Sequence, residues 1–154
     1  MNPVFRIAAI AGDGIGKEVL PEGLRVVKAA AARFGFELEI REIEWASCDW
    51  YAQHGTMMPS DWFDQLAGMD AIYFGAVGAP DVPDHITLWG LRLPICQGFD
   101  QYANVRPTRI LPGITSPLRN VGPGDLDWVI VRENSEGEYA GCGGRVHRGL
   151  PEEV

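Results

Sequence analysis

Two arginines and a tyrosine are the residues whose types and spacing suit chemistry most clearly. Arg106 stands in the segment YANVRP (102–107), and Arg132 and Tyr139 stand in VIVRENSEGEY (129–139). A guanidinium presents a planar fork of donors that matches a carboxylate in two parallel bonds, and a tyrosine hydroxyl can transfer a proton. The pattern favours a site that binds a small dicarboxylate or hydroxy acid.

A second candidate site is the glycine-rich turn AGDGIG (11–16), which lies between a predicted strand and a predicted helix. Glycines let the backbone turn tightly and approach a ligand, and a helix N-terminus favours an anion. The spacing is G-x-G-x-G and not the G-x-G-x-x-G of the dinucleotide fingerprint. From the residues alone, both a nucleotide site and a plain tight turn stay open.

The elements that position these residues alternate between strand and helix in the first half of the chain. Apolar runs, two-residue alternation and helical spacing separate the two types, and Gly35 and Gly68 supply helix stops. The predicted elements are a strand at 5–11, a helix at 17–34 with Pro21 in its first turn, a strand at 36–45, a helix capped by Ser60, and a strand at 70–77. Such alternation predicts an α/β fold with a mostly parallel sheet.

The second half is less regular. We expect a loop at 75–89, and Pro94 leaves the state of 88–96 open between loop and helical turn. The glycines and prolines of 107–125 predict a segment that crosses between subdomains, before a strand at 128–132. Residues 141–154 show no closing element, so the chain is expected to stop in mid-structure.

Composition and charge exclude several classes of protein. The net charge is −8 and there is no cluster of basic residues, which argues against nucleic-acid binding. No apolar stretch is long enough to cross a bilayer and no leader peptide is recognisable, so a cytoplasmic location without a membrane partner is expected. Three cysteines without C-x-x-C spacing fit reduced thiols, and the separated His54, His85 and His147 predict no metal site within the chain.

Four motifs in order and spacing resemble the β-decarboxylating dehydrogenases of isocitrate and isopropylmalate. They are AGDGIGKEV (11–19), FGAVG (74–78), FDQYANVRP (99–107) and VRENSEGEY (131–139). The segments WASC (45–48), MMP (57–59) and VPDHITLW (82–89) are most similar to the tartrate and D-malate dehydrogenase branch. The resemblance runs through the whole chain and implies the layered α/β architecture of that family, present here in part.

The resemblance also implies an activity. Relatives oxidise a 2-hydroxy acid with NAD and then release the β-carboxylate with the help of Mg²⁺ or Mn²⁺. Arg106 and Arg132 match substrate-binding arginines, and Tyr139 matches the catalytic tyrosine that protonates the enolate. The positions that match the nicotinamide end of the cofactor site are Gly12, Gly14, Ile15, Gly75 and Gly78.

The chain departs from the family pattern in two respects. Relatives carry a further arginine ten residues before the one that matches Arg106; Cys96 stands there in this chain, and Arg92 is a candidate replacement one helical turn away. The chain also has less than half the usual family length, and the catalytic lysine, the metal ligands and most of the adenosine site belong to later sequence. By itself it is expected to be inactive, with exposed apolar sheet surface.

On this interpretation residues 1–97 belong to the large cofactor-binding domain and residues 98–154 begin the small domain. The complete enzyme is expected to be a homodimer. Two other classes stay open from the sequence alone: a non-catalytic anion-binding or interaction module from a truncated gene, and a separate nucleotide-binding domain.

Overall fold

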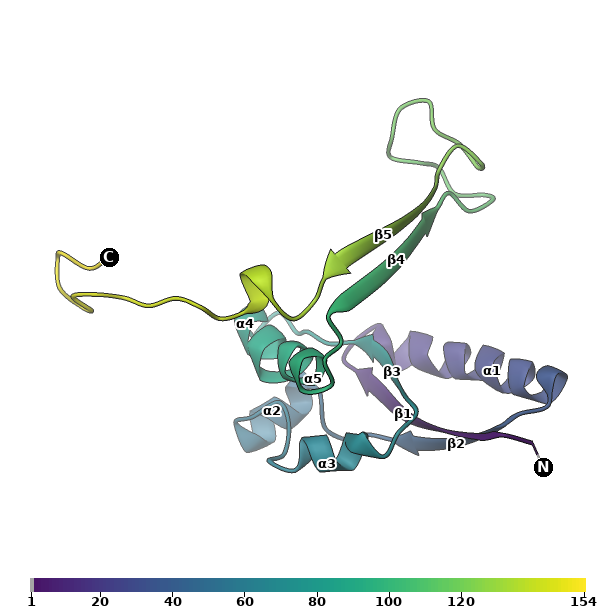
Figure 1. Cartoon of the computed structure of the whole chain (residues 1–154), viewed down its shortest axis with the longest axis horizontal. Helices are drawn as coiled ribbons and strands as arrows, with labels where there is room; N and C mark the ends of the chain where they lie inside the picture. The colour runs from purple at the N-terminus through teal and green to yellow at the C-terminus, as the bar shows by residue number, and fades with distance from the viewer. Residues whose placement is uncertain (1) are drawn as a thin grey trace. The chain divides into compact units, whose positions relative to one another are not determined.

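A computed structural model of the chain describes residues 2–154, which form two compact units (Figure 1). The first unit is Met1–Gly98 and the second is Phe99–Val154. No helix of the described residues is both long enough and apolar enough to cross a membrane.

The first unit is built on a three-stranded parallel sheet. Its strands are β1 (Val4–Gly12), β2 (Glu37–Glu42) and β3 (Ala71–Ala76), in the order β2-β1-β3. The central strand is the most buried, because it has neighbours on both edges, and its Ala8 and Ile10 have no exposed surface. The predicted α/β fold with a parallel sheet is confirmed.

Helix α1 (Gly16–Phe34) packs along this sheet and ends as predicted. Leu20 and Leu24 pack with Ala9 of β1, at the helical spacing that the sequence shows. Gly35 ends the helix with a left-handed backbone (φ 74°), which glycine adopts at little cost. Because the helix begins at Gly16, Pro21 lies in its interior and not, as predicted from the sequence, in its first turn.

Two short helices follow β2. Helix α2 (Cys48–His54), which was not predicted, begins after Ser47, whose hydroxyl accepts a hydrogen bond from the Trp50 N–H at 3.0 Å. Helix α3 is Trp62–Ala67. The prediction of Ser60 as its cap was wrong, because Asp61 precedes the helix and uses its carboxylate to accept from the Gln65 side chain.

The segment after β3 is more helical than predicted. The loop predicted at 75–89 is interrupted by α4 (Asp84–Thr87), which runs into a π-helical turn, η1 (Leu88–Arg92), and then α5 (Leu93–Gly98). Pro94 is the second residue of α5 and follows the π-helical turn directly, where the regular i→i−4 pattern is already interrupted because the Leu93 N–H donates to the Leu88 carbonyl. Leu91 and Leu93 anchor this segment, each with 1% of its surface exposed.

The second unit is an antiparallel pair, β4 (Ala103–Arg109) and β5 (Asp127–Glu133), followed by a single 3₁₀ turn, η2 (Gly137–Tyr139). Residues 110–126 connect the two strands inside one unit. The prediction that 107–125 crosses between subdomains was therefore wrong. The breakers build a long hairpin loop instead, which glycine and proline suit equally well.

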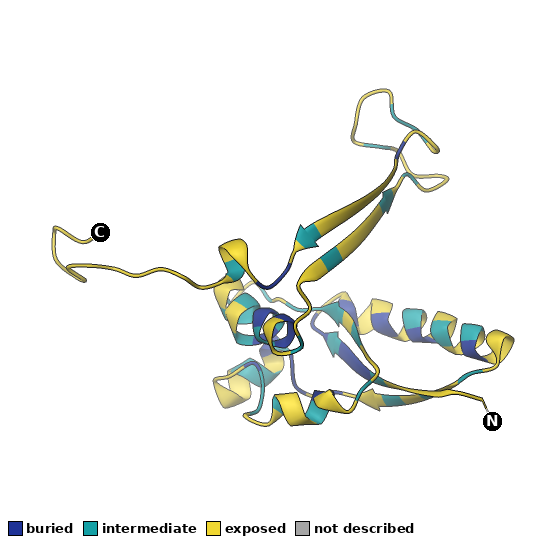
Figure 2. Ribbon diagram, viewed as in Figure 1, coloured by how far each residue is buried: buried dark blue, intermediate teal, exposed yellow. Residues whose placement is uncertain are grey.

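The hairpin exposes apolar side chains, as the sequence predicted for an incomplete sheet. Val129 and Val131 of β5 are 63% and 67% exposed, and Val105 of β4 is 58% exposed. Figure 2 shows that both strands are mostly coloured as exposed.

Candidate active site

The pairing of β4 with β5 divides the side chains of the hairpin into two faces. Arg106 lies opposite Ile130, and Asn104 lies opposite Arg132. Because side chains alternate between the faces of a strand, Arg106 and Arg132 share one face as diagonal neighbours. The backbone positions of such neighbours are about 7–8 Å apart. This arginine face comprises Asn104, Arg106, Thr108, Trp128, Ile130 and Arg132.

The opposite face is apolar. Val105 lies opposite Val131 and Pro107 lies opposite Val129, so four apolar side chains form one cross-strand block. At the end of this face, Arg109 Nε lies 2.7 Å from Asp127 Oδ1. The hairpin therefore separates two arginines from its apolar surface, and Arg109 is an arginine of the same strand on the other face.

Tyr139 returns to the side of Arg132 although seven positions separate them in the chain. The Arg132 guanidinium carbon lies 5.2 Å from the centre of the Tyr139 ring, a cation–π contact. Arg132 Nη2 also lies 3.4 Å from Glu138 Oε1, and both side chains are partly or largely exposed. The structure thus places a phenol, a proton donor or acceptor, beside a carboxylate-binding guanidinium.

The predicted cofactor residues belong to the first unit, where the β1–α1 turn meets the end of β3. Asp13 N–H donates to the Ala76 carbonyl at 2.7 Å, and Gly78 N–H donates to the Asp13 carboxylate at 3.1 Å. These bonds bring the glycine turn and the residues that follow β3 together.

The glycines of this region have two different physical roles. A Cβ on Gly12 would collide with the Ala76 carbonyl oxygen, and one on Gly75 would collide with the Ala11 carbonyl oxygen, so both are required by close backbone packing. Gly14 and Gly78 have positive φ (47° and 153°), and a Cβ on either would meet no heavy atom within 4 Å. The backbone at these two positions is open to a ligand, beside the exposed Ile15.

Sequence reasoning missed Asp13 as a structural residue. Its carboxylate is buried and accepts the Cys48 N–H at 2.9 Å as well as the Gly78 N–H. Burial, together with the hydrogen bond to Asp13, raises the pKa of the Cys48 thiol to about 11. The sequence carries little signal for this role, because the partners of Asp13 are backbone N–H groups of residues distant in the chain.

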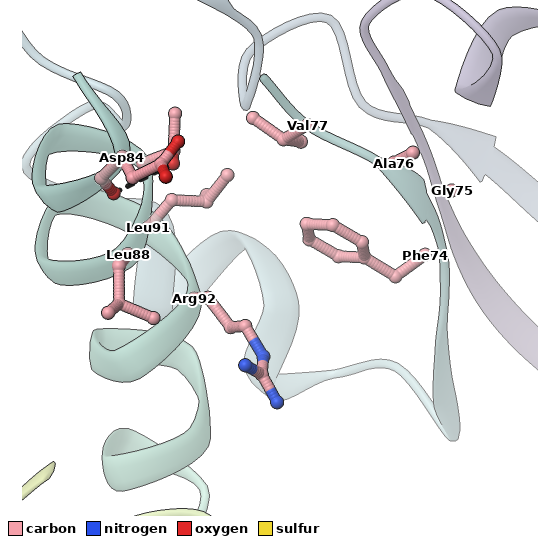
Figure 3. A pocket seen from close by; sticks show the side chains of 9 residues that line it. Phe74, Gly75, Ala76, Val77, Asp84, Leu88, Leu91 and Arg92 are labelled. Atoms are coloured by element: carbon pink, nitrogen blue, oxygen red, sulfur yellow. Dashed lines mark hydrogen bonds between the residues drawn. The ribbon is translucent and has the colours of Figure 1, made fainter. Parts of the chain in front are cut away.

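Arg92 lines a cavity of about 380 Å³ between β3 and the α4–η1 segment, together with Phe74 and Gly75 (Figure 3). Its guanidinium and the Phe74 ring project into the space that separates the strand from the helix. Arg92 therefore shares a cavity with one predicted cofactor residue. Cys96, one turn later, is buried.

No group of three or more His, Cys, Asp or Glu side chains is placed to hold a metal ion among residues 2–154. The His54 ring stacks on Trp50 with the ring centres 3.7 Å apart, and its Nδ1 atom lies 3.0 Å from the Trp50 carbonyl oxygen.

A model of the isocitrate/isopropylmalate dehydrogenase family matches residues 6–153. The chain belongs to this family. It is 71% identical over 151 residues to a probable tartrate dehydrogenase/decarboxylase of Agrobacterium vitis, which covers 97% of this chain and 42% of that protein. It is 60% identical over 155 residues to the D-malate dehydrogenase [decarboxylating] of Escherichia coli K12, covering 100% of this chain and 43% of that protein.

A solved structure supports the same family fold. The crystal structure of isocitrate dehydrogenase from Methylococcus capsulatus superposes with a TM-score of 0.70 at 25% identity, covering 92% of this chain and 38% of that one. The chain thus spans about 42% of the length of the curated relatives it matches. The α/β fold is that of the isocitrate/isopropylmalate dehydrogenase family, present in part.

Proposed function

We propose that this chain supplies the substrate-binding arginines and the catalytic tyrosine of an NAD-dependent 2-hydroxy-acid dehydrogenase of the tartrate and D-malate type, which decarboxylates its product oxidatively. The observation that carries the proposal is the arginine face of the hairpin. Arg106 and Arg132 lie on it as diagonal neighbours, with Tyr139 against Arg132. Two guanidinium groups on one face of a strand pair suit a small diacid.

The arginines and the tyrosine have separate roles in this proposal. Each guanidinium binds one carboxylate of the substrate, and a charge-assisted hydrogen bond of this kind is worth about 1.5–3 kcal/mol. The Tyr139 hydroxyl then donates a proton to the enolate carbon that is left when carbon dioxide departs. Arg92, which lines a cavity together with Gly75, is a further candidate residue for binding a substrate carboxylate.

The cofactor proposed for the first unit is NAD, which supplies a hydride acceptor. Gly12 and Gly75 hold the turn and the strand end in close contact, while Gly14, Ile15 and Gly78 offer approachable backbone. The residues present therefore fit the nicotinamide end of a dinucleotide. The described residues do not form a cage for the Mg²⁺ or Mn²⁺ of the family, so the chain's own groups are assigned no step through a metal.

The proposal assigns Met1–Gln97 to the large cofactor-binding domain and Gly98–Val154 to the beginning of the small domain. It also includes a homodimeric assembly and a cytoplasmic location for the complete enzyme. The homodimer is drawn from the family alone, and the cytoplasmic location from the family and from a sequence without a long apolar stretch.

The test is a comparison of two proteins in one assay. Reduction of NAD is followed with D-malate, tartrate and isopropylmalate in the presence of Mn²⁺, for the 154-residue chain and for a longer protein in which this chain is joined to the remaining length of a tartrate-type relative. The longer protein is expected to turn over a hydroxy diacid, and the chain alone is not. A longer protein that binds diacids but never reduces NAD would favour the non-catalytic anion-binding alternative.

A further inference from the structure

We propose that Glu133 is a positioning residue, whose carboxylate folds the turn at residues 134–136 and thereby sets Tyr139 beside Arg132. The assignment of a chemical role to Tyr139 rests on the proposed function. The placement of Tyr139 by Glu133 rests only on contacts within the second unit.

The carboxylate of Glu133 collects the backbone donors of the turn. One oxygen, Oε1, accepts the N–H groups of Asn134 at 2.9 Å, Ser135 at 2.8 Å and Glu136 at 2.6 Å, and the Ser135 hydroxyl lies 3.5 Å away. Three successive N–H groups that converge in this way form a concave anion site. The backbone bonds from Ser135 and Glu136 lower the pKa of the Glu133 carboxyl, so the charged form is the one that the turn holds.

The Glu133 side chain lies on the opposite side of β5 from the arginine face. It follows Arg132 directly at the end of β5, so alternation assigns it to the side of Val129 and Val131. Its carboxylate therefore binds the N–H groups of the turn and not the two arginines. The nearby Glu138, by contrast, contacts Arg132 itself.

The turn brings the chain back on itself. Glu136 is extended, Gly137 takes a left-handed backbone (φ 59°), and the Tyr139 N–H donates to the Glu136 carbonyl at 3.0 Å. A second tether holds the start of the turn, because Asn134 Nδ2 donates to the Gln101 carbonyl at 2.9 Å. The product of this path is the 5.2 Å contact of Arg132 with the Tyr139 ring.

Three variants of the 154-residue chain test the inference. Glu133→Ala removes the acceptor, and Glu133→Gln keeps a neutral acceptor on a side chain of the same length. Glu136→Gln is the control, because it removes a negative charge from the same segment at a side chain that does not build the turn. The readout is the nuclear Overhauser effect between the Tyr139 ring and the Arg132 side chain. Cross-strand contacts between Val105 and Val131 report whether the hairpin is still formed.

We expect Glu133→Ala to lose the Tyr139–Arg132 contact while the hairpin persists, and Glu133→Gln and Glu136→Gln to keep it. In Glu133→Gln alone, the amide protons of residues 134–136 should move upfield, because a neutral acceptor makes weaker hydrogen bonds. Retention of the contact in Glu133→Ala overturns the inference. If Glu133→Ala also loses the hairpin, unchanged amide shifts in Glu133→Gln overturn it instead, and upfield shifts support it.

Failure of the proposed function gives a different result. In the longer protein, Glu133→Ala should lower kcat for decarboxylation more than it raises KM for the diacid, because the arginines stay in place while the proton donor moves. Loss of the Tyr139–Arg132 contact with an unchanged kcat would leave the positioning role standing and remove Tyr139 from the chemistry.

Discussion

The two units of this chain differ in how far their side chains are buried. The first has a packed interior, in which Ala8, Ile10 and Leu66 have 1% of their surface or less exposed. In the described part of the second unit, the buried residues are Leu126, Asn134 and Ser135, each 7–8% exposed. The first unit is thus organised by apolar packing and the second by a strand ladder and a hydrogen-bonded turn.

This difference explains where the chemical groups lie. In the first unit, close backbone packing at Gly12 and Gly75 and the hydrogen bonds of the buried Asp13 hold the glycine turn against the end of β3, which suits a surface that contacts a ligand with its backbone. In the second unit, the proposed substrate-binding groups are long side chains on an open hairpin. An isolated two-stranded hairpin is at best marginally stable in water, so its apolar face is the part that most needs a cover.

The largest effect should come from cavity formation in the first unit. Ile10→Ala removes buried methyl groups from the central strand and should lower the free energy of unfolding by about 2–5 kcal/mol. Val131→Ala, on the exposed apolar face of the hairpin, should change it by about 0.5 kcal/mol or less. Urea unfolding of both variants measures the contrast, and equal losses would show that the apolar face is already covered.

The two units should also differ in the reactivity of their cysteines. Cys48 is buried with its pKa raised to about 11 from 9.0, so at pH 8 its reactive thiolate is about 100-fold scarcer than in an unperturbed thiol. Cys142 of the second unit is exposed. Labelling with iodoacetamide followed by mass spectrometry should modify Cys142 long before Cys48. Rapid modification of Cys48 in the folded chain would contradict the buried contact with Asp13.

The two faces of the hairpin can be separated by a matched pair of substitutions. Arg106→Lys replaces a planar fork by a point charge on the arginine face and should lower kcat/KM of the longer protein about 10- to 100-fold. Arg109→Lys is the control, because Arg109 lies on the other face of the same strand and pairs with Asp127. Steady-state kinetics with the preferred diacid provide the measurement. Equal losses in both variants would remove the distinction between the faces.

The smallest effect concerns Glu138, which occupies Arg132 in the absence of substrate. This ion pair joins side chains that are 38% and 74% exposed, and such pairs are worth about 0.2–1 kcal/mol. Under the proposed function the substrate displaces the Glu138 carboxylate from Arg132, so Glu138→Gln should lower KM by about 1.5- to 5-fold at low salt. A rise in KM would indicate that Glu138 orients Arg132 rather than competing for it.

The sequence predicted the regular elements better than the connections. Helix α1 was predictable because apolar spacing, Gly35 and the preceding glycine turn agree with one another. Helix α2 has only seven residues and one buried position, Cys48, so it leaves little periodicity to detect. The loop at 110–126 was misinterpreted because breakers report a turn but not which elements it joins.

Candidate residues for the site could be proposed from the sequence, but their geometry could not. Residue types pointed to Arg106, Arg132 and Tyr139, whereas only the register of β4 against β5 shows that the two arginines share a face. The fold of the turn that returns Tyr139 depends on a glutamate that looks like any exposed acid in the sequence. Asp13 was overlooked for the same reason, because its partners are backbone N–H groups.

We propose above that the arginine face of the hairpin binds a hydroxy diacid. The most direct measurement follows the side-chain Nε resonances of Arg106, Arg132 and Arg109 by NMR while D-malate or tartrate is added to the chain. We expect the Arg106 and Arg132 resonances to shift together along one saturating curve, and the Arg109 resonance to stay unchanged. Equal shifts of all three resonances, or none at Arg106 and Arg132, would contradict it.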